Sequence, residues 1–145
     1  MKSEFVRLRE MLSKGDFSCV IANGTEVRTF TGRGVQDLFL LYVRTPAFLS
    51  NAIIADKVVG MGAAALMILG GVASLYARVA STPALAMLRR YGVEVECGTE
   101  VGQISNRSRT GTCPVETICR TLETPEEMFS AIKRFLEDTG QIQEH

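Results

Sequence analysis

The first 30 residues show two different spacings of hydrophobic positions. Residues 3–14 place apolar side chains three and four apart, which predicts an amphipathic helix. Residues 17–22 and 25–30 are rich in β-branched and aromatic side chains and flank Asn23-Gly24. Since this dipeptide suits the positive backbone angles of a two-residue turn, the two runs are predicted to pair as a β-hairpin.

The middle of the chain predicts two long helices and a buried strand. A helical pattern covers residues 35–44, and residues 47–55 are expected to form a short helix or a loop. A helix rich in glycine and alanine is predicted over residues 56–69, with Asp56 as its first residue. Its small side chains would allow it to lie very close to a sheet. Residues 72–80 are an apolar run typical of a buried strand.

The chain after residue 81 predicts five further elements. Thr82 is expected to cap a helix, and Thr124 with Glu127 has the spacing of a capping box at the start of another. By range, these elements are a helix over 82–91, strands over 93–97 and 101–105, and helices over 113–122 and 125–138.

The order of these elements predicts an α/β protein, a three-layer α/β/α sandwich with a mixed sheet. A chain of 145 residues is long enough to bury a complete core in one domain. Neither a repeat nor a linker divides it. Residues 1–145 are therefore expected to form a single domain, with the last helix, 125–138, as an appendage.

An uncharged run from Val58 to Ala77 is long enough to suggest a membrane span. Because Gly70-Gly71 interrupts it, and because alanine and glycine outnumber leucine and isoleucine, a core helix followed by a core strand explains it better. Lysine plus arginine equal aspartate plus glutamate at 16 each. This balance gives no global field that would attract nucleic acid or an anionic membrane, so neither is expected as a partner.

Cysteine usage indicates a reducing compartment. Four cysteines, Cys19, Cys97, Cys113 and Cys119, are irregularly spaced, and no signal peptide is evident. Free thiols in the cytoplasm are therefore expected, with two disulfides in a secreted protein as the alternative. Cys19 and Cys97 fall in predicted strands and are expected to be inert core thiols.

Local motifs carry a resemblance to a known family: the run Ala55–Gly60 before three alanines, the dipeptide Asn106-Arg107, and Cys113-Pro-Val-Glu116. With the order of elements, they make the chain similar, over about residues 15–120, to an uncharacterised family within the cytidine-deaminase-like superfamily. That family is known as a domain of unknown function. The resemblance implies a deaminase-like sandwich with a pocket at the N-termini of two core helices.

The zinc ligands of that superfamily are missing. Zinc deaminases begin the core helix with His-x-Glu and the next helix with Pro-Cys-x-x-Cys, where this chain has Asp56-Lys57 and, at the cysteine positions, Ala84 and Met87. The only histidine is His145, whereas a catalytic zinc needs three protein ligands, mostly imidazole or thiolate. The prediction is a protein without zinc or another cofactor, for which deamination through a metal-bound hydroxide is not expected.

Asp56 and Lys57 are the first two candidate catalytic residues, at the predicted start of the glycine- and alanine-rich helix. Asp56 would accept hydrogen bonds from free backbone N–H groups there, and this capping role alone can explain it. Lys57 would place a cation at the positive end of the helix dipole. That placement is unfavourable unless the lysine holds an anionic or carbonyl-bearing ligand.

Cys113 and Glu116 are the second pair of candidate catalytic residues. A thiol at a helix N-terminus has a lowered pKa, which favours the nucleophilic thiolate. Glu116 has the position of a capping-box glutamate and could equally act as a general acid or base. The structural alternative is a small buried cysteine beside a capping glutamate.

The polar loop before Cys113 is a candidate anion site. It carries an amide, two guanidinium groups and several hydroxyls, and it leads into a helix N-terminus, an arrangement suited to phosphate or carboxylate. An exposed polar turn is the alternative. The candidate ligand-binding residues are Asn106, Arg107, Arg109 and Thr112.

Two functions fit these candidates. The first is binding or modification of a nucleotide-like or other anionic small molecule at the two helix N-termini, with Lys57 on the anion and Cys113 as nucleophile. The second is a non-catalytic regulatory or structural subunit of a homo-oligomer, built on a deaminase-like fold that has lost its activity.

Overall fold

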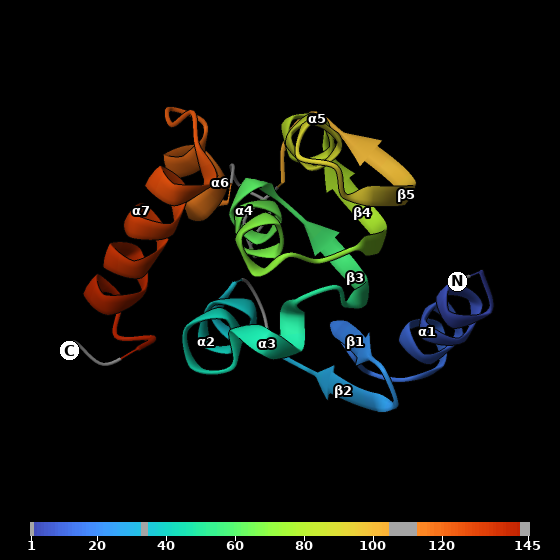
Figure 1. Cartoon of the computed structure of the whole chain (residues 1–145). Helices are drawn as coiled ribbons and strands as arrows, with labels where there is room; N and C mark the ends of the chain where they lie inside the picture. Colours follow the sequence, from blue (N-terminus) through green and yellow to red (C-terminus); the bar gives the residue numbers. More distant parts are fainter. Residues whose placement is uncertain (1, 33–34, 105–112, 143–145) are drawn as a thin grey trace.

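Strands of the described residues form a single mixed sheet (Figure 1). The structure is a computed structural model, and it describes residues 2–32, 35–104 and 113–142. The strands are β1 (Cys19–Asn23), β2 (Glu26–Phe30), β3 (Ile53–Val59), β4 (Ser74–Ser81) and β5 (Glu94–Val101). Their order in the sheet is β2-β1-β3-β4-β5. β1 pairs antiparallel with β2 and β3, whereas β3, β4 and β5 run parallel.

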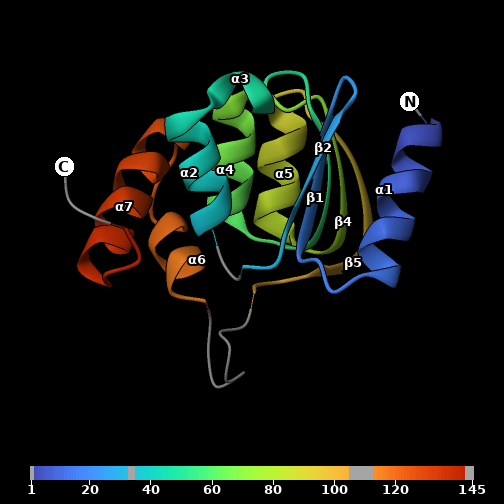
Figure 2. The same cartoon turned by 90° about the horizontal axis from the view of Figure 1, so that it is seen from below.

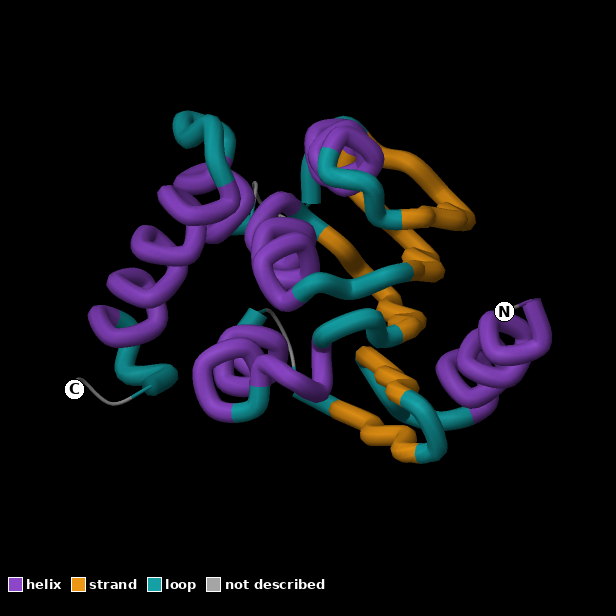
Figure 3. Tube along the Cα trace, in the orientation of Figure 1, coloured by secondary structure: helices purple, strands orange, loops and turns teal. Residues whose placement is uncertain are grey.

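Helices cover both faces of this sheet. Within the described ranges they are α1 (Lys2–Lys14), α2 (Gln36–Arg44), α3 (Pro46–Leu49), α4 (Met61–Gly70), α5 (Thr82–Arg90), α6 (Pro114–Cys119) and α7 (Pro125–Asp138). α1 packs on one face, against β1 and β3, while α2, α4 and α5 lie on the other face, with α6 and α7 outside α4 (Figure 1 and Figure 2). The trace in Figure 3 shows the same layers. The predicted three-layer α/β/α sandwich with a mixed sheet is therefore confirmed.

α4 is the centre of the core. It is apolar on all sides because the sheet, α2, α5, α6 and α7 surround it. A Cβ at Gly62 would overlap a methyl group of Val115 and lie 3.4 Å from Ile132, so the glycine lets α6 and α7 sit directly on α4. α7 buries Met128, Ile132 and Leu136 in this core, which makes it an integral part of the domain rather than an appendage.

The apolar run Val58–Ala77 is divided among the end of β3, α4 and the start of β4. Each piece is part of the core, as expected for a buried helix followed by a buried strand. In the described ranges of the chain, the helices are all too short or too polar to cross a bilayer.

Several local predictions are confirmed. The capping box is present: Thr124 Oγ1 accepts from the backbone N–H of Glu127, and Glu127 Oε1 accepts from that of Thr124, over 3.2 and 3.1 Å. The hairpin is also present, but Asn23 pairs with Glu26, so the turn lies one residue later than predicted. Asn23 is held in the strand because its amide donates to the carbonyl oxygens of Phe48 and Ser50.

The helix predicted over 56–69 is wrong at its beginning. Residues 53–59 form β3, and the helix begins only at Met61, after the extended Gly60. β3 is a buried strand between β1 and β4, and its β-branched residues favour this conformation. Asp56 and Lys57 therefore lie in a strand and not at a helix N-terminus.

Two smaller boundaries also differ from the predictions. The cap of α5 is Ser81 and not Thr82, because Ser81 Oγ accepts from the backbone N–H of Ala84 at 3.3 Å. The strands predicted over 93–97 and 101–105 are one strand, β5, as far as Val101.

Gly62→Ala is expected to lower the free energy of unfolding by about 1–3 kcal/mol, because the added methyl overpacks the contact with Val115. Helix propensity alone would favour alanine by about 1 kcal/mol, so a loss of stability would come from packing. Urea unfolding followed by circular dichroism measures the change. Gly102→Ala is the matched control, since a Cβ there meets nothing within 4 Å. Equal stability of the two variants would show that the contact between α4 and α6 can accommodate the added methyl group.

Candidate functional site

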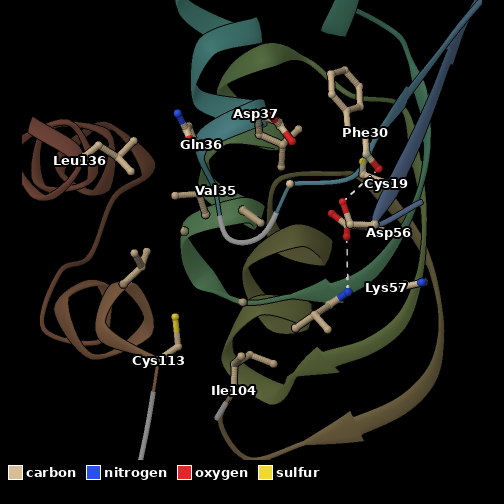
Figure 4. Close-up of a pocket in the computed structure, with 18 of the residues that line it drawn as sticks. Cys19, Phe30, Val35, Gln36, Asp37, Asp56, Lys57, Ile104, Cys113 and Leu136 are labelled. Atoms are coloured by element: carbon tan, nitrogen blue, oxygen red, sulfur yellow. Dashed lines mark hydrogen bonds between the residues drawn. The ribbon is translucent and has the colours of Figure 1, made fainter. Parts of the chain in front are cut away.

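A cavity of about 1130 Å³ lies between the hairpin, α2, the N-terminal end of α4, α6 and the C-terminal end of α7 (Figure 4). Most of its wall is apolar. The polar side chains in the wall include two thiols, Cys19 and Cys113, and the carboxylates of Asp16, Asp37, Asp56 and Glu116.

Asp56 points from β3 into this cavity (Figure 4). It is 9% exposed and lies opposite Cys19 in the β1–β3 register. The Cys19 thiol donates a hydrogen bond to the carboxylate, and the backbone N–H of Val58 donates to its Oδ1 over 3.4 Å. Burial nevertheless raises the pKa of Asp56 from 3.8 to about 7, because these hydrogen bonds offset only part of the lost hydration. Near neutral pH Asp56 is therefore able both to take and to give a proton.

Cys19 is the partner that sequence reasoning missed. It is buried, and burial, followed by the negative charges of Asp56 and Asp37, raises the pKa of its thiol well above 9.0. A thiol of this kind stays protonated and acts as a hydrogen-bond donor, not as a nucleophile. Only the pairing of β1 with β3 brings Cys19 to Asp56, and no local motif signals that pairing.

Lys57 does not join Asp56 in one site. Successive side chains of a strand point to opposite faces, and Figure 4 shows the Lys57 side chain leading away from the Asp56 carboxylate. Lys57 borders the cavity. The predicted pairing of the two residues at a helix N-terminus is wrong, because both lie in β3.

Cys113 lines the side of the cavity opposite Asp56 (Figure 4). It is the N-cap residue of α6, and its side chain makes no capping hydrogen bond. Its backbone N–H donates to the carbonyl oxygen of Ile104 at 2.7 Å, which fixes the entry into the helix. The four cysteines are free thiols. The nucleophilic role of Cys113 stays a prediction.

Glu116 joins the beginnings of two other helices to α6. It is 1% exposed, and its Oε1 accepts from the backbone N–H of Met61, at the start of α4, over 3.3 Å. The same oxygen accepts from the hydroxyl of Ser81, the N-cap of α5, over 3.1 Å. Oε2 is buried and has no hydrogen-bond partner in the described structure. A Cβ at Gly60 would lie 2.6 Å from Oε2, so the glycine makes room for the carboxylate.

The carboxyl group of Glu116 therefore already occupies the N-terminus of α4, where an anionic ligand was predicted. The predicted anion-binding residues Asn106, Arg107, Arg109 and Thr112 lie outside the described residues, so their role stays a prediction. Lys57 is the only cationic residue among those described around the cavity, and its side chain leads away from Asp56. The described wall therefore favours a ligand that donates hydrogen bonds.

A metal ion has no ready site in this arrangement. Over residues 2–32, 35–104 and 113–142, no group of three or more histidine, cysteine, aspartate or glutamate side chains is suitably placed to hold one. Asp56 and Glu116 act from different elements, β3 and α6.

Comparisons with known proteins place the fold. A family model described as TM1506, domain of unknown function (DUF1893), matches residues 7–136. A crystal structure of a DUF1893 family protein (TM1506) from Thermotoga maritima at 2.70 Å resolution is similar, with a TM-score of 0.84 and 20% sequence identity. The match covers 92% of this chain and 90% of that chain. At this identity, the likeness shows a shared fold. No curated protein matches the chain.

The stability of the protein is expected to fall as the pH rises from about 4 to about 7, because folding raises the pKa of Asp56 from 3.8 to about 7. In this range the folded protein holds the proton more tightly than the unfolded chain, so ionisation of Asp56 opposes folding. The effect is on the order of 4 kcal/mol at most. Asp56→Asn should remove it, and urea unfolding between about pH 5 and about pH 8 measures it. Asp138→Asn, on the surface of α7, should leave the pH profile unchanged; a matching loss there would contradict the assignment.

Glu116→Ala is expected to lower the free energy of unfolding by about 3 kcal/mol, because the N–H of Met61 and the hydroxyl of Ser81 both lose a charged acceptor. Glu116→Gln retains one acceptor oxygen and should lose clearly less. Thermal and urea unfolding compare the two variants with Glu126→Ala, an exposed glutamate of α7. Equal losses in the alanine and glutamine variants would show that the hydrogen bonds of Oε1 do not join the helices.

Proposed function

The chain belongs to the DUF1893 family, whose description assigns no activity, and we propose that it binds a nucleotide-like small molecule in the cavity beside Asp56. The observation that carries this proposal is a carboxylate, 9% exposed, in the wall of a cavity of about 1130 Å³. Small-molecule sites usually measure about 300–1,000 Å³ and combine apolar walls with a few buried polar groups. At about 1130 Å³ this cavity is slightly larger than that range, and its wall combines apolar residues with a few buried polar groups.

The base-like part of the ligand meets Asp56 in this proposal. An amino group or a ring N–H donates to the ionised carboxylate, and a ring nitrogen accepts from the protonated one. Since the pKa of Asp56 is about 7, both forms are present near neutral pH. Apolar lining residues such as Phe30 and Val35 supply the surface on which a planar ring packs.

The anionic part of the ligand is proposed to lie away from the start of α4, because Glu116 already occupies that position. In this proposal Asn106, Arg107, Arg109 and Thr112 hold it. These residues precede Cys113, which lies on the cavity wall opposite Asp56. The two ends of one ligand are thereby assigned to two sides of the cavity.

We also propose that the sandwich is a deaminase-like fold in which a buried carboxylate replaces the metal. Two core helices begin side by side at Met61 and Thr82, and the Glu116 carboxylate lies between their starts through Met61 and Ser81. Asp56 could shuttle a proton in this proposal, and the Cys113 thiol stays the candidate nucleophile. Binding is the part of this proposal that the geometry supports best.

Asp56→Asn is expected to weaken binding of a nucleoside at least about tenfold, because a charge-assisted hydrogen bond contributes about 1.5–3 kcal/mol. Isothermal titration with cytidine, adenosine, guanosine, uridine and their 5′-monophosphates, near pH 6 and pH 8, measures the loss. Asp138→Asn is the matched control and should bind as the wild type does.

Two outcomes would overturn the proposal. One is that no nucleoside or nucleotide of this set binds the wild-type protein. The other is that Asp56→Asn binds them as tightly as Asp138→Asn does. In either case, a regulatory or structural homo-oligomeric subunit becomes the better explanation. Light scattering tests this alternative by measuring the mass of the protein in solution.

A further inference from the structure

Three hydrogen-bond donors lie together on the face of the sheet that carries α1. Asp56 pairs with Ala77 and Val58 with Val79, so Lys57 on β3 is the direct neighbour of Arg78 on β4. Ala55 and Tyr76 pack with the core beneath α1, so the side chains two residues later, Lys57 and Arg78, point to that same face. Tyr76 is the third donor, one position before Arg78 on this face.

These donors have no partner in the described structure. The ammonium of Lys57, the guanidinium of Arg78 and the hydroxyl of Tyr76 make neither a hydrogen bond nor an ion pair with the described residues. All three residues are partly buried. The Tyr76 ring is fixed from above by the Arg9 guanidinium, 4.3 Å from the ring centre.

Like charges side by side on neighbouring strands repel each other. The acidic residues on this part of the sheet do not relieve the repulsion: Glu96 is paired with Arg9 at 3.6 Å, and Glu100, further along β5, makes no ion pair with Arg78. An anion bound between the two cations would relieve it.

β5 contributes a glycine next to these donors. Ala77 pairs with Cys97 and Val79 with Thr99, so Gly98 lies beside Arg78. A Cβ at Gly98 would stand 2.8 Å from the Arg78 carbonyl oxygen and 3.3 Å from the Tyr76 hydroxyl. The absence of a side chain at Gly98 therefore gives the Tyr76 hydroxyl room to lie over β5, next to Arg78. In Figure 1, α1 lies over β1 and β3, and no described helix lies over β4 and β5 on this side.

We infer that Lys57, Tyr76 and Arg78 form a binding site for a phosphate-type oxyanion on the α1 face of the sheet, separate from the cavity. Lysine, arginine and a phenol are complementary to phosphate in charge and in hydrogen bonding. Lys57 thus binds an anion, but on the other side of β3 from Asp56. The site does not depend on the ligand proposed for the cavity.

Inorganic phosphate is the probe that tests this inference. Titration of the ¹⁵N-labelled protein, against sodium chloride of matched ionic strength, should shift the amide signals of Lys57, Arg78 and Gly98 in a saturable way. Lys57→Gln and Arg78→Gln should each weaken the response about tenfold or more, the effect of losing a charged hydrogen-bond donor. Arg89→Gln, at the exposed end of α5, is the matched control and should leave it unchanged.

The folding of the variants is checked in the same samples. Without phosphate, both glutamine variants should be at least as thermostable as the wild type, because the repulsion is removed. Phosphate should raise the melting temperature of the wild type and of Asp56→Asn, but not of Lys57→Gln or Arg78→Gln. The response of Asp56→Asn separates this site from the cavity.

Three results would overturn the inference: chloride causes the same shifts as phosphate, Arg89→Gln weakens the response as much as Arg78→Gln, or the saturable shifts occur at Gly60 and Met61 and not on the α1 face. None of them affects the nucleoside titrations, so failure here and failure of the proposed function are distinguishable.

Discussion

The carboxylate of Glu116 holds together three helices that are far apart in the sequence. One oxygen accepts from the start of α4 and from the cap of α5, and the residue itself belongs to α6. Helix starts carry unsatisfied N–H groups and a partial positive charge. A buried carboxylate at that position accepts the hydrogen bonds that water would otherwise accept, and it occupies the place that a bound anion could take. The absence of a side chain at Gly60 leaves room for the carboxylate, and its absence at Gly62 allows the close packing of α6 on α4. The cavity keeps its shape because these contacts fix α6 against α4.

The pleat of β3 decides how the polar residues of this region are shared between the two faces of the sheet. Asp56 faces the cavity, whereas Lys57 faces the side of α1. If both lay in the first turn of a helix, as the sequence suggests, the lysine could neutralise the aspartate across one pocket. The strand forbids this, because adjacent side chains point in opposite directions. Asp56 is left with the Cys19 thiol and the backbone N–H of Val58 as partners, and burial raises its pKa.

The sequence was sufficient for elements with strong local signals. The capping box of Thr124 and Glu127, the hairpin at Gly24 and the layered α/β architecture all follow from local chemistry and element order. β3 was mistaken for helix because two charged residues interrupt a short apolar run, and periodicity alone does not separate a short buried strand from a helix start.

The candidate site was predictable only where its residues carry a local chemical signal. Asp56, Cys113 and Glu116 were each marked by their chemistry, and they do line one cavity. Cys19 has no such local mark, since only the antiparallel pairing of β1 with β3 brings it to Asp56. The capping role of Glu116 was expected within its own helix, but the packing of α6 on α4 directs it to α4 and α5. Contacts between residues 35 or more positions apart cannot be inferred from local spacing.

The raised pKa of Asp56 also explains why the cavity favours a donor. An ionised carboxylate in an apolar wall is costly because one thiol and the backbone N–H of Val58 do not replace its hydration. A ligand that donates further hydrogen bonds stabilises the ionised form and lowers the pKa, so its binding releases a proton when the carboxyl was protonated before. A ligand that accepts instead stabilises the protonated form and takes up a proton. The direction of proton transfer on binding therefore identifies which edge of a ligand meets Asp56, independently of what the ligand is.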